Sequence, residues 1–137
     1  MAFVLDASAA LPWCFLDEAT TQSNHLLDQA VTGERVYVPA HWPMEVLNGL
    51  TRASRRGRLD DPSVVTFLAT LVALDIVVEE LSISEQWSEA LPLILQYRLS
   101  AYDAAYLALA KRLGVGLATL DTQLRLAAQT EGVSLSI

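Results

Sequence analysis

The chain has 137 residues, of which 53% are hydrophobic and 18% are charged, and its formal net charge is −7. This length suits one domain with a real core, and the acidic balance excludes a protein coated with cations for general nucleic-acid binding. The only cysteine, Cys14, permits no internal disulfide and fits a reducing cytoplasm, while Asp6 interrupts the apolar N-terminal residues and argues against a signal peptide or a membrane span.

Short apolar segments alternate with longer helical patterns along the chain. Pro43 is typical of a helix start, Ser84 is the predicted cap of a later helix, and glycines such as Gly114 end helices. The predicted strands cover residues 3–5, 35–38, 76–78, 115–120 and 133–135, and the predicted helices cover 7–15, 18–31, 43–56, 61–74, 84–97 and 102–113, with one more starting at Asp121.

The predicted strands are apolar throughout, as strands buried on both faces are. Such strands belong to a parallel sheet covered by helices, so we predict a single three-layer α/β domain over residues 1–137. In these sheets ligands bind beyond the carboxyl ends of the strands, where the strand order reverses. Asp6 and Asp121 each close a predicted strand at that edge.

Four acids stand out: Asp6, Glu45, Asp103 and Asp121. Taken singly, each also suits a helix cap or the first turn of a helix, and the residues alone leave both interpretations open. Glu45 and Asp103, however, lie among apolar neighbours, which is unusual for a solvated helix face. Carboxylates gathered at one sheet edge would repel and raise one another's pKa values unless a cation lay between them, and Mg²⁺ or Mn²⁺ prefers such oxygen ligands.

A family resemblance covers nearly the whole chain. It is carried by four motifs in order, at residues 4–9 (Val-Leu-Asp-Ala-Ser-Ala), 45–48 (Glu-Val-Leu-Asn), 102–104 (Tyr-Asp-Ala) and 118–121 (Ala-Thr-Leu-Asp). Together they resemble the PIN-domain ribonucleases, in particular the VapC-type toxins of type II toxin–antitoxin pairs. The run at residues 48–59 also resembles the segment that follows the family's glutamate.

The resemblance implies a PIN-like, five-stranded parallel sheet in the order 3-2-1-4-5 with helices on both faces. It implies that Asp6, Glu45, Asp103 and Asp121 form the catalytic metal cluster for Mg²⁺, with Mn²⁺ as a substitute, supported by the hydroxyls of Ser8 and Thr119. The implied activity is that of an endoribonuclease that hydrolyses RNA phosphodiesters and leaves a 5′-phosphate. The implied partners are RNA and a cognate antitoxin protein in the cytoplasm, and the high hydrophobic content fits a homodimer.

Arginines follow Glu45 on the same predicted helix. Arg52 and Arg56 lie roughly 10 and 16 Å from Glu45 along the helix axis and share about the same face. We predict that they bind RNA phosphates, although a solvated helix end explains them equally well. Arg125 could also reach phosphates, and His41, four residues before Glu45, has no assigned role.

Two other classes compete with a nuclease. A phosphatase or receiver domain would use an aspartate nucleophile, but Ser8 stands where a phosphatase needs a second aspartate, and the only lysine, Lys111, lies inside a predicted helix. A binding module without catalysis would use the acids as caps. A metal-dependent rise in melting temperature together with RNA cleavage distinguishes the nuclease from both.

Overall fold

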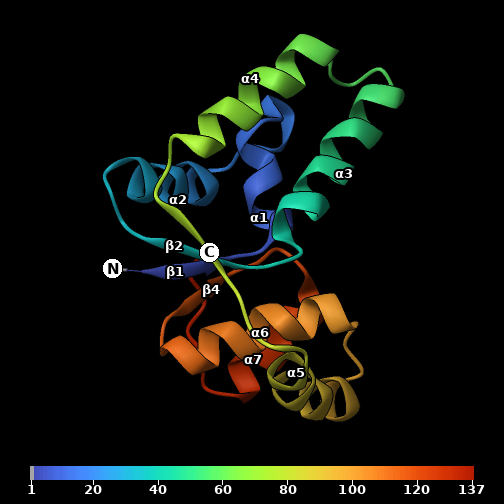
Figure 1. The fold of residues 1–137 in the computed structure, drawn as a ribbon. Coiled ribbons are helices and arrows are strands. Elements are labelled where there is room, and N and C mark those ends of the chain that lie inside the picture. The colour runs from blue at the N-terminus through green and yellow to red at the C-terminus, as the bar shows by residue number, and fades with distance from the viewer. Residues whose placement is uncertain (1) are drawn as a thin grey trace.

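The computed structural model describes residues 2–137 as a parallel sheet between two layers of helices, with α1 to α4 on one face and α5 to α7 on the other (Figure 1). The strands are β1 (Phe3–Leu5), β2 (Val36–Pro39), β3 (Ile76–Glu79) and β4 (Gly116–Ala118). The helices are α1 (Ala7–Ala10), α2 (Thr21–Val31), α3 (Trp42–Arg55), α4 (Asp61–Val72), α5 (Ile83–Tyr97), α6 (Ala101–Leu113) and α7 (Thr122–Thr130), with 3₁₀ turns η1 (Leu11–Trp13) and η2 (Leu16–Glu18).

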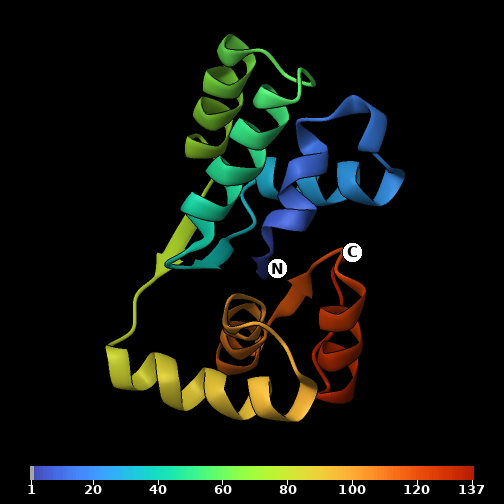
Figure 2. The ribbon, with the colours of Figure 1, turned by 90° about the vertical axis from the view of Figure 1, so that its right-hand side faces the viewer.

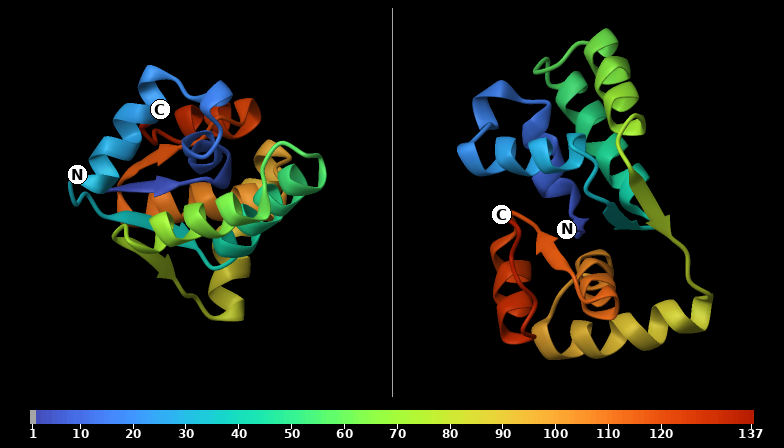
Figure 3. Two further views of the ribbon diagram at one scale, coloured as in Figure 1. Left: turned by 90° about the horizontal axis from the view of Figure 1, so that it is seen from above. Right: turned by 90° about the vertical axis from the view of Figure 1, so that its left-hand side faces the viewer.

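The sheet order among the described residues is β3-β2-β1-β4, and every pair is parallel. Val4 of β1 pairs with Tyr37 on one side and with Leu117 on the other. The strand arrows therefore point the same way, and their carboxyl ends share one edge (Figure 3). The predicted α/β architecture is confirmed, with the strand order reversing between β1 and β4.

The predicted fifth strand is wrong as a strand. Leu135 forms only a single parallel bridge with Leu117, whose N–H donates to the Ser134 carbonyl at 2.8 Å and whose carbonyl accepts from the Ser136 N–H at 2.9 Å. On this side of β4 the serine hydroxyls crowd Gly116 so closely that an added Cβ would lie 2.4 Å from the Ser136 Oγ. The segment therefore occupies the fifth position of the order 3-2-1-4-5 without forming a ladder.

Helix α6 is the central helix of its layer and covers β1 and β2. The Ser100 Oγ caps its first turn by accepting from the Asp103 N–H at 3.1 Å, and Gly114 ends it with a φ of 66°, where a side chain would be strained. Six of its residues are buried, Tyr106 among them. The helix thus holds Asp103 at the edge of the sheet where the strands end.

Two predicted helix starts are corrected by local hydrogen bonding. Helix α2 begins at Thr21 instead of residue 18 because Thr20 and Ser23 form a reciprocal capping box. The predicted cap Ser84 is also wrong, since Ser82 caps α5 in a second capping box with Glu85. A hydroxyl three residues before a matching polar side chain determined both starts.

The remaining helices range from four residues in α1 to 15 in α5. The predicted helix 7–15 is divided into α1 and η1, and Pro12 lies within that 3₁₀ turn. Helices α3 and α4 lie side by side as a hairpin on one face of the sheet, while α5 crosses the molecule on the other (Figure 2). Over residues 2–137, no helix has both the length and the apolar content needed to cross a membrane.

Candidate active site

Asp6 follows β1 directly and is buried, with 3% of its surface exposed. Its Oδ2 accepts hydrogen bonds from the Thr119 hydroxyl at 2.6 Å and from the Ser8 hydroxyl at 2.8 Å. Burial raises the pKa of Asp6, the two hydroxyls act against that rise, and the charge of Glu45 adds to it. A buried carboxylate with two neutral donors keeps oxygen lone pairs and negative charge available to a cation.

The same two hydroxyls join the end of β1 to the end of β4. The Ser8 Oγ accepts from the Leu120 N–H at 3.0 Å, and the Thr119 Oγ1 accepts from the Asp121 N–H at 3.1 Å. The Asp121 side chain is exposed and caps α7 by accepting from the Leu124 N–H at 2.8 Å. Asp121 is therefore an N-cap, as the simpler interpretation of the sequence proposed, and it also lies beside the Asp6 network.

Glu45 lies in the first turn of α3, half-buried and held by two side chains. Its Oε2 accepts from the Tyr106 hydroxyl at 2.9 Å and lies 3.2 Å from the His41 Nε2. The His41 side chain, and then the Tyr106 hydroxyl, lower the pKa of Glu45 against the effect of burial. The carboxylate is thus kept ionised near the sheet edge.

Asp103 shows most directly that the acids converge. Its pKa is raised from 3.8 to about 6, chiefly by burial and then by the charges of Asp6, Asp121 and Glu45. The fold therefore brings all four carboxylates into one electrostatic neighbourhood, although they are up to 115 positions apart in the chain, from Asp6 to Asp121. Within residues 2–137, no three acidic, histidine or cysteine side chains stand close enough together, as placed, to hold a metal ion.

The arginines that follow Glu45 differ in their ion pairs. Arg52 and Arg56 are exposed at the end of α3, and the described residues include no ion pair to either. Arg58, in contrast, pairs with Asp17 and Glu18 and lies over the Phe15 ring, 4.5 Å from its centre.

Arg125 also has a structural role, since its guanidinium donates to the carbonyls of Thr119 and Ile137. These bonds tie α7 to the end of β4 and to the C-terminal segment. Arg125 is therefore held by the protein's own backbone, where the sequence analysis had proposed a phosphate contact.

Two residues near the site were missed in the sequence. Tyr106 lies three residues after Asp103, which places it on the same helix face, and this spacing could have revealed it. Arg98 has a φ of 56° and a ψ of 37°, the left-handed conformation that L-residues avoid, and it is the only described non-glycine residue with a positive φ. The Gln123 amide donates to the Arg98 carbonyl at 3.3 Å, which ties this exposed arginine to the start of α7.

Comparison with known proteins confirms the resemblance to the PIN-domain ribonucleases. The model of the PIN domain matches residues 3–129. Ribonuclease VapC3 of Pyrobaculum aerophilum is 33% identical over 124 residues, covering 90% of this chain and 92% of that protein. Ribonuclease VapC12 of Mycobacterium tuberculosis is 31% identical over 134 residues, covering 98% and 95%.

Solved structures share the fold at lower identity. A protein from Pyrobaculum aerophilum superposes with a TM-score of 0.70 at 22% identity, covering 93% of this chain and 84% of that one. A toxin–antitoxin complex from Klebsiella pneumoniae gives a TM-score of 0.65 at 19% identity, covering 98% and 97%. The fold and the matching motifs define a PIN domain. The chain belongs to that family and, within it, to the VapC ribonucleases.

Proposed function

We propose that this protein is a Mg²⁺-dependent endoribonuclease that acts as the toxin of a type II toxin–antitoxin pair. The observation that carries the proposal is the convergence of four carboxylates from separate elements: Thr119 links Asp6 to Asp121, and the charges of Asp6, Asp121 and Glu45 all act on Asp103. A structural acid gains nothing from such neighbours, whereas a metal ligand needs them. The kinship with VapC ribonucleases supports RNA as the substrate.

The four carboxylates fit a hard divalent cation by their chemistry. Every candidate ligand atom is an oxygen, and Asp6, Glu45, Asp103 and Asp121 would hold the ion, with Mn²⁺ as a substitute. When bound, Mg²⁺ supplies charge neutralisation at the scissile phosphate and lowers the pKa of a water. Positive charge at this place also lowers the electrostatic cost of ionising Asp103.

The surrounding side chains hold the acids in position. The hydroxyls of Ser8 and Thr119 fix the Asp6 carboxylate, so that its orientation is set before RNA binds. Tyr106 and His41 do the same for Glu45 and keep it ionised. Asp6 and Glu45 are thus each held by neutral or weakly basic side chains.

Exposed cations around the acids would hold the RNA backbone. Arg52 and Arg56 extend along α3 away from Glu45, and Arg98 lies beside the start of α6. In a protein with a net charge of −7, such local cations are what allow a polyanion to approach. We assign phosphate contacts to these three arginines.

The proposed partners are a cognate antitoxin and a second copy of the chain. Toxin–antitoxin complexes with the same fold support the first, and a cytoplasmic location follows from an RNA target. Large apolar side chains are exposed on several helices, and this supports surfaces that a partner chain covers. They include Met44, Val65, Val72, Ile83, Leu91, Leu95 and Leu126.

RNA cleavage tests the proposal. Protein stripped of metal with a chelator is expected to leave a single-stranded RNA intact and to cut it internally after Mg²⁺ or Mn²⁺ is added. Asp6→Asn is expected to lose at least a hundredfold in rate, while the matched change Asp28→Asn, at an exposed position on α2, retains full activity. Cleavage that persists in the chelator, or in Asp6→Asn, contradicts the proposal.

A further inference from the structure

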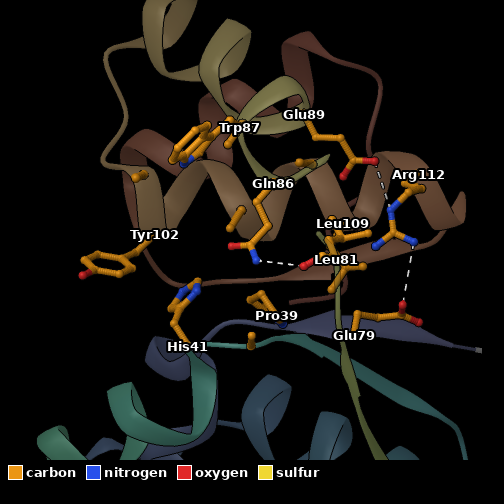
Figure 4. Close-up of a pocket in the computed structure, with 15 residues that line it drawn as sticks. Pro39, His41, Glu79, Leu81, Gln86, Trp87, Glu89, Tyr102, Leu109 and Arg112 are labelled. Carbon is orange, nitrogen blue, oxygen red and sulfur yellow. Dashed lines mark hydrogen bonds and ion pairs between the residues drawn. The ribbon is translucent and has the colours of Figure 1, made fainter. Parts of the chain in front are cut away.

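A pocket of about 420 Å³ lies between α6, the first half of α5 and the ends of β2 and β3. Figure 4 shows two kinds of side chain in it: His41, Trp87 and Tyr102 at one end, and Glu79, Glu89 and Arg112 at the other. Small and apolar residues of α6, such as Ala105 and Ala108, line the space between them. This volume and this mixture are typical of a site for a small organic group.

The aromatic end of the pocket adjoins the candidate active site through His41 and Tyr102. His41 lines the pocket, and its Nε2 lies 3.2 Å from the Glu45 carboxylate. Its ring centre lies 5.0 Å from that of Tyr102, the residue directly before Asp103. A nucleotide whose phosphate lies at the acids therefore has this pocket beside it.

The charges in the pocket argue against a phosphate as its occupant. Arg112 is already paired, with its Nε 3.2 Å from Glu89 and its Nη1 3.7 Å from Glu79. Two carboxylates thus outweigh one guanidinium, and a phosphate would be repelled. A neutral group that stacks and accepts or donates hydrogen bonds suits the site better.

The aromatic rings of Trp87 and Tyr102 line the pocket and are exposed to solvent, so their faces are open to a stacked base. Trp87 is 70% exposed and Tyr102 is 63% exposed, although both are large aromatic residues. Between them and the charged end lies Gln86, whose amide donates to the Leu81 carbonyl at 3.1 Å and is thereby held in place (Figure 4). Aromatic faces beside a fixed amide are what a single-stranded base uses in many RNA-binding proteins.

We propose that this pocket binds the base of a nucleotide next to the cleaved phosphodiester, stacked on Trp87 and Tyr102. The proposal rests on the RNA-cleaving function proposed above and adds a specificity site to it. The base leaves the RNA stack and enters beside His41, while the backbone stays at the acids. The pocket thereby helps to select where the RNA is cut.

Abasic scanning tests the pocket. Short single-stranded RNAs that lack one base at successive positions are bound to metal-free protein in a chelator, and affinity is measured by fluorescence anisotropy. Loss of one base next to the cleavage position should weaken binding to the wild type about tenfold, and this dependence should fall below about twofold in Trp87→Ala and in Tyr102→Ala. The control Gln96→Ala, which removes an exposed side chain on the same helix and outside the pocket, should behave as the wild type does.

Cleavage of the intact RNA by each variant with Mg²⁺ separates the two proposals. If the protein cleaves RNA but the loss of a base weakens binding equally in the wild type and in Trp87→Ala, the pocket proposal is wrong and the nuclease proposal is unaffected. RNA that is neither bound nor cut overturns both. If Trp87→Ala changes the oligomeric state in size-exclusion chromatography but leaves base dependence intact, the ring belongs to a protein interface and the pocket proposal is wrong.

Discussion

Asp103→Asn is expected to make the metal-free protein more stable at neutral pH while it abolishes nuclease activity. The half-buried Asp103 carboxylate has a pKa of about 6 in the folded chain, against an ordinary value of 3.8, because of burial and three nearby carboxylates. Ionisation therefore costs more in the folded state than in the unfolded state. Asparagine has a similar shape and removes that cost.

The size and the pH range of the effect follow from the two pKa values. A difference of about 2 corresponds to at most about 3 kcal/mol. Because Asp103 is only half-buried, solvent screening reduces this to about 1 kcal/mol. The carboxyl group is protonated in both states below about pH 4, so the destabilisation is absent there, grows between pH 4 and 6, and is complete above pH 6.

Thermal unfolding in a chelator at pH 4 and pH 7.5 measures this difference. At pH 7.5 the Tm of Asp103→Asn should exceed that of the wild type by about 3 °C, and at pH 4 the two should agree. Added Mg²⁺ should then raise the Tm of the wild type more than that of the variant. A variant that is less stable than the wild type at pH 7.5 without metal would refute the idea that the acids repel one another.

Three further predictions concern residues around the four acids. Arg98→Gly should change the Tm by less than about 2 °C, because relief of the left-handed backbone, about 1 kcal/mol, offsets the extra freedom of glycine in the unfolded chain; a loss of more than 5 °C would disagree. Thr119→Val should lower the free energy of unfolding in urea by about 1–3 kcal/mol, since a buried carboxylate and a backbone N–H lose this hydroxyl, and an unchanged midpoint would show that the hydroxyl contributes nothing. Removing the charges of Arg52 and Arg56 with glutamine should reduce the salt dependence of RNA binding by about 1.4 in slope, whereas the control Arg35→Gln, at an exposed ion pair with Asp75, should leave the slope unchanged.

The sequence predicts the fold well where hydrophobic burial decides the structure. Strands that are apolar throughout must be covered on both faces, so residues such as Val4 and Val38 indicated the parallel sheet, and both are fully buried. The parallel topology then placed Asp6 and Asp121 at the same edge. Both conclusions depend on rules that hold for any chain with this pattern.

The sequence predicts less where the choice is between near-equivalent neighbours. Ser82 and Ser84 are both suitable caps, and only the side chain of Glu85, three residues after Ser82, selects the first. The sequence around Leu135 also does not distinguish a single bridge from a full strand, because the crowding of Gly116 by serine hydroxyls arises from tertiary contacts.

The pocket and the backbone conformation of Arg98 could not be read from the sequence. The 420 Å³ pocket takes residues from β2, β3, α5 and α6, and no local pattern in any one of them predicts it. The left-handed conformation of Arg98 is equally hidden, since this position would suit glycine and carries a long cation instead. The catalytic roles of the four acids stay predictions, supported by their electrostatic coupling.

Crystals soaked in Mn²⁺ test whether the four acids bind a metal, because the ion can be located by anomalous scattering. We expect a peak roughly 2.1 Å from carboxylate oxygens of Asp6 and Asp103, with Asp121 or Glu45 completing the set directly or through water. Small rotations of these side chains from their present positions would accompany binding. A saturating soak in which no peak lies among these acids, or in which the peak lies elsewhere on the molecule, would contradict a metal site at these carboxylates.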